Sequence, residues 1–274
     1  MKTGILILAH NNPNQLKYLV EALKQDFSIF VHIDAKCDIP VDFIPAGDNV
    51  FVFKKHKIHW GDENTIYAML DLFRISYERG CDYSMLVSGA DLPIKPLSAI
   101  KAKIQENPEI NYVHYEKMPR SVWPLNGGFD RLTLYWDAVK NRNKLTVGNY
   151  LFAALRAFQR ITGLKRKILP MDYYGGSTWL NLSREMIKLV LDFIEDNPKY
   201  VAQFRHTRNA DEIFFQTIIL NSKLADKVCK SDLRYVDWTS GPEYPRTLTM
   251  DDYDKIMQSD ALFARKFDEK RDDS

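Results

Sequence analysis

The sequence has few cysteines, few glycines and prolines, and no long apolar run. Its 274 residues include 3 Cys, 12 Gly and 12 Pro. Cys37, Cys81 and Cys229 are too few and too far apart for a disulfide framework, so we expect a reducing compartment. The Gly and Pro content excludes collagen-like and low-complexity classes. No run reaches the roughly 20 apolar residues of a membrane-spanning helix, so none is predicted.

A large excess of charge of one sign is also missing. Lys and Arg number 38 and Asp and Glu number 36, which leaves a net charge of +2. Nucleic acid is therefore not an expected partner, because phosphate binding needs a pronounced basic excess. The hydrophobic content of 45% is ample for a globular core. With no internal repeat and no Gly/Ser linker, the length favours one domain.

Several common catalytic signatures are absent from the sequence. It contains no GxxxxGK[ST], GxGxxG, GxSxG, HExxH or CxxC pattern. P-loop NTPases, dinucleotide-binding enzymes and hydrolases with a nucleophile elbow are thereby disfavoured. His56 and His59 are three apart, but without further ligands at metal-binding spacing they do not predict a zinc site.

Short apolar runs alternate with segments of helical period in the first third of the chain. Buried strands are predicted at residues 4–9, 28–33, 49–53 and 82–87. Helices are predicted at 62–77 and after Pro13, where Asn12 or Asn14 can cap. This alternation predicts an α/β fold with a mostly parallel sheet and helices on both faces.

Polar residues follow three of these predicted strands. They are His10, Asp34 and the 88–91 turn. Open α/β sheets bind ligands beyond the carboxyl ends of their strands, so this edge is the expected ligand site.

Residues 112–150 are irregular and rich in aromatics, and a helix is predicted at 149–169. Its apolar positions are Leu151, Phe152, Leu155, Phe158 and Ile161, and its basic ones are Arg156, Arg160, Lys165, Arg166 and Lys167. The favoured interpretation is a core-packed helix with a solvated basic face. The alternative is a surface helix, over residues 151–167, that meets a membrane or an anionic acceptor.

The last third begins with residues 174–182, YGGSTWLNL. A helix capped by Ser183 is predicted through 194, and a late strand is predicted at 233–238. The charged tail, 269–274, is expected to fray. Asp211 and Glu212 open a further helix, whose dipole favours negative charge there. A carboxylate so placed can serve as a general base, although such residues more often only stabilise the helix.

Cations near the end of the chain are a second set of candidate site residues. Arg246 and Lys266 come from different segments and could converge on a diphosphate. Solvated surface charge is the alternative for each of them.

Taken together, eight segments in order resemble the core-2 and I-branching β-1,6-N-acetylglucosaminyltransferases, a family that also holds the peptide O-xylosyltransferases. They are ILILAHNNPNQL (5–16), VHIDAK (31–36), HWGDENTIYAMLDL (59–72), LVSGADLPI (86–94), YGGSTWLNLSREM (174–186), ADEIFFQTIILNS (210–222), LRYVDW (233–238) and LFARKFD (262–268).

The resemblance implies a GT-A-like fold with a Rossmann-like nucleotide-sugar half at about 1–110 and an acceptor and catalytic half at about 111–268. It implies an inverting glycosyltransferase that moves a sugar from a UDP-sugar, GlcNAc first and xylose next, to a glycan hydroxyl. No metal or other cofactor is expected. Asp91 has alanine before it and no acid two positions back, so the paired-carboxylate clamp is missing. A metal-dependent enzyme of another donor class, or a non-catalytic nucleotide-sugar- or glycan-binding module, are the alternatives.

The resemblance also assigns roles to individual residues. Glu212 matches the catalytic base, Arg246 and Lys266 match the diphosphate-binding cations, and Asp34 matches the uracil-binding acid. Further donor-side positions are Ala9, His10 and Asp91. Acceptor-side positions are Glu116, Gly176, Ser177, Trp179 and Trp238.

The chain departs from the family where the acceptor-contacting acid is replaced by His114. An animal-type acceptor is therefore not expected. The expected acceptor is an oligosaccharide or lipid-linked glycan of bacterial surface polysaccharide synthesis, and the basic helix at 151–167 would suit a lipid-linked one. We expect a soluble bacterial relative in the cytoplasm, with peripheral contact at the inner face of the membrane through 151–167.

Overall fold

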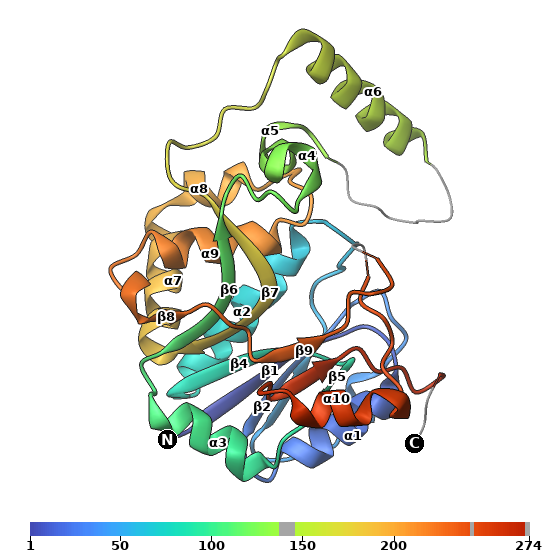
Figure 1. Cartoon of the computed structure of the whole chain (residues 1–274), viewed down its shortest axis with the longest axis vertical. Helices are drawn as coiled ribbons and strands as arrows, with labels where there is room; N and C mark the ends of the chain where they lie inside the picture. The colour runs from blue at the N-terminus through green and yellow to red at the C-terminus, as the bar shows by residue number, and fades with distance from the viewer. Residues whose placement is uncertain (137–145, 242–243, 272–274) are drawn as a thin grey trace.

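The computed structural model describes residues 1–136, 146–241 and 244–271. Within them, a seven-stranded sheet has the order β3-β2-β1-β4-β7-β6-β8 (Figure 1). Its strands are β1 (Thr3–Ala9), β2 (Ser28–Ile33), β3 (Val50–Phe53), β4 (Tyr83–Ser88), β6 (Asn111–Lys117), β7 (Tyr174–Ser183) and β8 (Val228–Cys229). Strands β3, β2, β1 and β4 are mutually parallel, and β7 runs antiparallel to β4 and β6. The predicted α/β class with a mostly parallel sheet is confirmed.

Helices cover both faces of the sheet because its central strands are apolar on both sides. Helices α1 (Pro13–Leu23) and α3 (Leu97–Glu106) pack on one face, in a cluster that includes Leu16, Ile100 and Ile5. Helices α2 (Asn64–Glu78), α7 (Arg184–Asp196) and α9 (Asp211–Leu220) pack on the other. Each fully buried Leu or Ile in these layers contributes about 1.5–3 kcal/mol.

The two predicted helix caps have different outcomes. The Ser183 hydroxyl accepts a hydrogen bond from Met186 N at 3.2 Å, so the cap of α7 is confirmed. At α1 Asn12 occupies the N-cap position before Pro13, as predicted, but its side chain makes no capping hydrogen bond. Instead the Glu269 carboxylate accepts from Gln15 N at 2.7 Å, where the helix dipole favours an anion. The tail is thus attached at Glu269, contrary to the expectation of fraying from that residue.

A small sheet of order β5-β10-β9 lies beside the carboxyl end of β4. Its strands are β5 (Asp91–Pro93), β9 (Arg234–Val236) and β10 (Phe263–Arg265). The late strand predicted at 233–238 is β9. The sequence does not reveal β5 and β10, which depend on pairing between residues far apart in the chain, β10 with β5 and with β9.

The remaining described elements are short. They are α4 (Pro124–Gly127), α5 (Phe129–Thr133), α8 (Pro198–Gln203), α10 (Tyr253–Gln258), and the 3-10 turns η1 (Val41–Phe43), η2 (Ala225–Lys227) and η3 (Met250–Asp252). The segment expected to be irregular, 112–150, thus contains α4 and α5 as well as most of β6. Residues 137–145 of it lie outside the described chain.

Helix α6 (Val147–Thr162) differs most from expectation. It ends at Gly163, whose positive φ of 73° closes the helix well before residue 169. Its apolar side is exposed, with Leu151 at 64% and Ile161 at 86%, so the core-packed interpretation is wrong. Among the described residues, no helix combines the length and apolar character needed to cross a bilayer.

Candidate functional site

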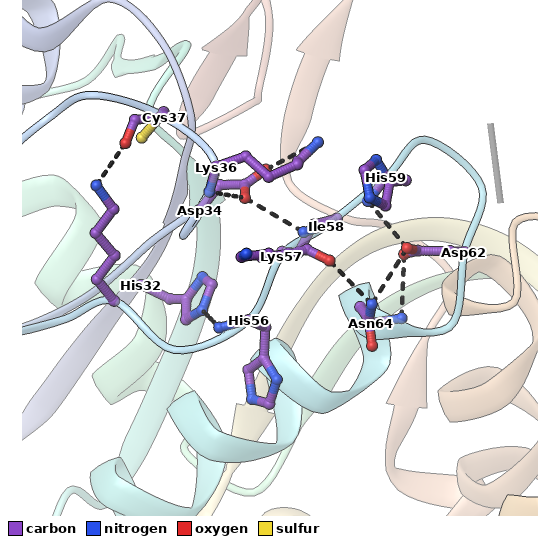
Figure 2. Close-up of polar contacts among 11 residues, drawn as sticks. His32, Asp34, Lys36, Cys37, His56, Lys57, Ile58, His59, Asp62 and Asn64 are labelled. Carbon is purple, nitrogen blue, oxygen red and sulfur yellow. Dashed lines mark hydrogen bonds and ion pairs between the residues drawn. The ribbon is translucent and has the colours of Figure 1, made fainter. Parts of the chain in front are cut away.

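The predicted donor-side residues lie at the carboxyl ends of β1 and β2. The backbone N–H of Asp34 donates to Ala9 O at 2.8 Å, which joins the two strand ends. The Asp34 Oδ1 accepts from the backbone N of Lys36 at 2.9 Å and of Ile58 at 3.3 Å (Figure 2). Lys36 Nζ lies 3.5 Å from Oδ2. Ala9 and Asp34 are both buried, at 5% exposure each, so a bound base can reach only the rim of this carboxylate.

His10 is surrounded by charges at the same edge. His10 as a whole is exposed, yet the protein around the imidazole ring partly desolvates it and so lowers the pKa of His10. Asp34 opposes this effect, while Lys36, Arg265 and Lys266 add to it through their positive charges. Lys266 is thus near enough to His10 for its positive charge to act on the ring. Its role toward a diphosphate stays a prediction.

The two predicted diphosphate cations differ in their partners. Arg246 donates from Nε and Nη2 to Asp237 Oδ2, at 2.9 and 2.7 Å, and its Nη2 also contacts Asp252. These carboxylates raise the pKa of Arg246, and hydrogen bonds from Thr239 and then Arg246 lower the pKa of Asp237 to about 2. Lys266 makes no salt bridge within the described residues. It is therefore the more available cation, whereas Arg246 must exchange partners to meet a phosphate.

Asp91 holds the small sheet to the end of β4. Its carboxylate is fully buried, 3.0 Å from Arg234 Nε and 3.4 Å from Arg265 Nε. It also accepts from the Ser88 hydroxyl at 2.5 Å and from the Ser88 backbone at 3.2 Å. A carboxylate with no exposed surface cannot touch a donor sugar, so we correct its assignment to a structural one. A buried charge of this kind is tolerated because it is paired on both sides.

Glu212 lies in the first turn of α9, as predicted. Arg131 Nη1 donates to its Oε2 at 2.6 Å, and the Glu212 side chain is 27% exposed. The other oxygen, Oε1, has only a long contact of 3.5 Å with Asn209 Nδ2. One oxygen is thus fixed by a charge-assisted hydrogen bond and the other is left to accept a proton.

The neighbouring acid has a different environment. Thr178 of β7 donates from its hydroxyl to Asp211 Oδ2 at 2.6 Å. Burial, followed by the charge of Glu212, raises the pKa of the Asp211 carboxyl. Adjacent carboxylates in contrasting environments take different roles, and here Asp211 ties α9 to the sheet while Glu212 faces Arg131.

Trp123 connects Glu212 to the predicted acceptor residue Glu116. The Arg131 guanidinium lies 3.9 Å from the Trp123 ring centroid, and that of Arg120 lies 4.2 Å from it. Arg120 Nε in turn donates to Glu116 Oε2 at 3.1 Å. These stacked contacts form a continuous path from Glu116 to Glu212.

The glycines of β7 serve packing. A Cβ on Gly175 would lie 2.5 Å from the Trp123 ring, and one on Gly176 would lie 1.8 Å from His114 O. Both glycines lie within a strand, so neither shapes a turn, and the missing side chain of Gly176 faces β6. The predicted acceptor role of Gly176 is corrected accordingly. The Ser177 carbonyl accepts from Gln216 Nε2 at 2.6 Å, so its backbone also has a partner within the protein.

The two predicted acceptor tryptophans are placed differently. Trp179 stacks with Arg265 at 4.3 Å and Arg234 at 5.1 Å, which joins β7 to the small sheet. Trp238 follows β9 and is 54% exposed, so its ring is available to a ligand. Exposed aromatic rings are suitable platforms for sugar rings.

One loop, residues 54–63, touches both ends of the site. Its Ile58 contacts Asp34, and Gly61 O accepts from Asn209 N at 3.0 Å, three residues before Glu212. Asp62 anchors the loop by accepting from the backbone N of His59 at 3.0 Å and of Asn64 at 3.1 Å (Figure 2). Burial raises the pKa of Asp62 to about 6.

A pocket of about 150 Å³ adjoins this loop. It is lined by Trp60, Gly61, Trp136, Asn149, Phe152, Arg156 and Arg208. Because Arg208 directly precedes Asn209, the pocket lies close to the Glu212 end of the site.

A family model for the Core-2/I-Branching enzyme matches residues 6–259. The chain belongs to this family. The match includes all of the described elements from β2 to α10 and the segment that carries Glu212 and Arg131.

The chain is also similar to curated proteins of a plant and an insect. The chain is 31% identical over 108 residues, 38% of its length, to "Beta-glucuronosyltransferase GlcAT14B" of Arabidopsis thaliana. It is 23% identical over 240 residues, 82% of its length, to "Xylosyltransferase oxt" of Drosophila melanogaster. Each match covers 25% of the relative, so the chain spans about a quarter of the length of these proteins. A solved 4-diphosphocytidyl-2C-methyl-D-erythritol synthase aligns with 77% of this chain and 92% of its own at a TM-score of 0.36 and 11% identity.

Sequence reasoning missed Arg120 and Arg131. Arg131 is 81 residues from its partner Glu212, in a segment without periodicity, so nothing local indicates the pair. Within the described part of this family member, no group of three or more His, Cys, Asp or Glu is arranged to hold a metal ion. Metal independence nevertheless stays a prediction.

Proposed function

We propose that the protein is an inverting glycosyltransferase that moves a sugar from a UDP-sugar to a hydroxyl of a glycan acceptor without a metal ion. Membership of the Core-2/I-Branching enzyme family supports the reaction class. The observation that carries the proposal is the state of Glu212, held at one oxygen by Arg131 and open at the other. Loop 54–63 connects this carboxylate with the edge that carries Lys36, Lys266 and His10.

The chemistry follows from these positions. The acceptor oxygen attacks the anomeric carbon opposite the leaving group, and Glu212 Oε1 takes the acceptor's proton as the new bond forms. The bond from the anomeric carbon to the UDP oxygen breaks, and UDP leaves with the electron pair. Lys266 stabilises the growing negative charge on the diphosphate, with Arg246 joining after it exchanges a carboxylate for phosphate. Arg131 keeps the base oriented through its hydrogen bond to Oε2.

Donor and acceptor are proposed more narrowly. The rim of Asp34 and the end of β1 near His10 would receive the uridine. Among candidate donor sugars we rank GlcNAc first and xylose second. The name of the plant relative adds glucuronic acid as a third candidate. The exposed ring of Trp238 and the Glu116 end of the arginine path would receive the acceptor. A bacterial surface glycan, lipid-linked or free, is the proposed acceptor.

The thermal stability of the purified protein with nucleotides and nucleotide sugars tests the donor site. Each is added with manganese and, separately, with EDTA. A ligand that binds the folded state alone must raise Tm. We expect UDP and one UDP-sugar to raise it equally in both conditions. A shift that requires manganese would support a metal-dependent enzyme instead, and no shift with any nucleotide would contradict the donor site.

A second measurement separates the transferase from a binding module that keeps the fold without turnover. UDP release from the stabilising UDP-sugar is followed with and without glycan acceptors. Hydrolysis or transfer that depends on Glu212 is expected. Binding without any release of UDP, at every acceptor tried, would favour the non-catalytic module.

A further inference from the structure

Helix α6 turns its apolar face toward solvent. Four large apolar side chains at helical spacing are exposed, namely Val147 at 76%, Leu151 at 64%, Phe158 at 54% and Ile161 at 86%. The helix stands at the outer end of the molecule, beyond α4 and α5 (Figure 1). A helix that packs on its own domain buries such a stripe, so this orientation is the reverse of the usual one.

The opposite, mostly polar face of α6 attaches it to the protein. Gln159 is 4% exposed and accepts from Tyr135 N at 3.1 Å through its side-chain oxygen. Arg156 donates to Tyr135 O at 3.4 Å, and its guanidinium lies 4.4 Å from the Trp136 ring centroid. The Phe152 ring lies 5.7 Å from that of His206. These contacts fix which side of the helix points outward.

The charge around the exposed face is of one sign. Residues 146–171 contain five Lys or Arg and no Asp or Glu. Arg166 donates to the carbonyls of Leu134 and His206, at 3.4 and 3.3 Å, so it anchors the segment to the body. Arg160 and Lys167 are exposed at the edges of the helix and its following turn. An apolar stripe flanked by cations is complementary to an anionic lipid surface.

We propose that α6 docks this protein on an anionic lipid bilayer. The helix lies in the plane of the interface, with Phe158 and Ile161 among the acyl chains and Arg160 and Lys167 against lipid phosphates. A second copy of the chain is a poorer occupant. Two α6 segments packed face to face would bring Arg160 and Lys167 of each copy together, with no acid in residues 146–171 of either copy to pair with them. The proposal stands independently of the transferase reaction.

The docking would place the bilayer on the side of the catalytic carboxylate. Phe152 and Arg156, on the inward face of α6, line the pocket that also contains Trp60 and Gly61. Gly61 contacts Asn209, three residues before Glu212. A membrane-bound molecule would therefore approach the protein from the α6 side.

Co-sedimentation with lipid vesicles tests the proposal on the full chain. One set of vesicles is phosphatidylcholine alone and the other is phosphatidylcholine mixed with phosphatidylglycerol. We expect binding to the mixed vesicles, weakened by salt, and little binding to the neutral ones. Equal, salt-insensitive binding to both sets would overturn the anionic assignment, and absence of binding to either would overturn the proposal.

Paired variants identify the surface. Phe158→Gln with Ile161→Gln should weaken vesicle binding by roughly tenfold or more, because two apolar side chains leave the interface. Arg160→Gln with Lys167→Gln should lower the affinity for the mixed vesicles by about fivefold for each cation removed. The matched controls are Tyr18→Gln, an exposed ring (72%) on α1, and Lys223→Gln with Lys255→Gln. Controls that bind vesicles as weakly as the α6 variants would overturn the assignment to α6.

Sedimentation velocity distinguishes the lipid from a second copy. We expect a monomer at all concentrations, and equal Tm for the wild type and for Phe158→Gln with Ile161→Gln, since both side chains already meet solvent. A dimer that the same two substitutions dissociate would show that α6 is covered by another copy, which would overturn the lipid assignment.

Discussion

At the residue scale, the site separates charges that are committed to the fold from charges that remain available. Asp91 is buried and ion-paired, Asp211 is half-buried and accepts from Thr178, and Arg246 is held by two carboxylates. Glu212 Oε1 and Lys266 Nζ lack such close partners within the described residues. A catalytic or ligand-binding group must be able to contact the substrate. Substitutions of Glu212 and Lys266 therefore give the clearest tests.

Glu212→Gln keeps the shape of the side chain and removes its basicity. We expect kcat to fall by roughly a hundredfold or more, since a general base contributes about two to four powers of ten. The Tm shift produced by UDP should be unchanged. The control is Glu185→Gln, in the first turn of α7, which changes the same residue type at another helix start. Equal loss of UDP binding and turnover in Glu212→Gln would contradict its role as base.

Lys266→Met should weaken UDP binding by about tenfold, because a phosphate loses one charge-assisted contact. Titration calorimetry with UDP and with uridine measures the effect. Uridine affinity should not change, because it carries no phosphate. Lys270→Met, an exposed lysine four residues later, is the control. Parallel loss of UDP and uridine affinity would instead indicate a general disturbance of the edge near His10.

At the scale of elements, short segments from distant parts of the chain make the site. The three-residue strands β5, β9 and β10 bring Asp91, Arg234 and Arg265 into one buried cluster. Strand β7 adds Thr178 and Trp179, which link α9 to that cluster. The irregular 118–133 segment rests on β7 through Trp123 and the glycine that it covers.

Gly175→Ala tests this packing. The added Cβ would meet the Trp123 ring at 2.5 Å, so the ring must shift and the free energy of unfolding should fall by about 1–3 kcal/mol. Because Arg131 stacks on Trp123, turnover should fall as well. Urea unfolding and UDP release measure the two effects. Gly47→Ala, where the new Cβ meets side-chain atoms of Asn49 at 3.2 Å and of Val50 at 3.3 Å that need shift only slightly, should cost much less. Unchanged stability in Gly175→Ala would refute the tight contact.

At the scale of the whole molecule, stability and surface character depend on groups spread over the fold. Asp62 is an example for stability, because burial raises the pKa of its carboxyl from 3.8 to about 6. The folded state then binds more protons than the unfolded chain between these values. Its contribution to stability is complete below about pH 4 and is lost as pH rises through 6.

Asp62→Asn should remove this contribution. The free energy of unfolding of the variant, relative to wild type, should therefore rise between pH 4 and pH 7, by about 2–3 kcal/mol at most. Urea titrations at several pH values provide the difference. The control is Thr239→Val, which removes a hydrogen bond that helps to lower the pKa of Asp237 to about 2. Its difference from wild type in the free energy of unfolding should not change between pH 4 and pH 7, because Asp237 stays ionised there. A difference for Asp62→Asn that is flat with pH would refute the raised pKa.

The first four parallel strands and several helices could be predicted because their patterns are local. Predicted strands at 4–9, 28–33, 49–53 and 82–87 lie within one residue of the observed ones. Family membership followed from eight ordered segments, and the family match confirms it. The pairing of Glu212 with Arg131 could not be foreseen, because it depends on a contact 81 residues away in the chain.

The sequence by itself determined the α/β class, the edge where polar residues gather, and the acid at the start of α9, since each depends on periodicity or position within one element. Only the tertiary structure decided which charges are already paired and which face of α6 is outside. The same stripe of Leu151, Phe158 and Ile161 is compatible with a core or a surface helix in sequence. The difference lies in where Gln159 and Arg156 find partners, and hydrogen bonds to distant residues leave no periodic trace.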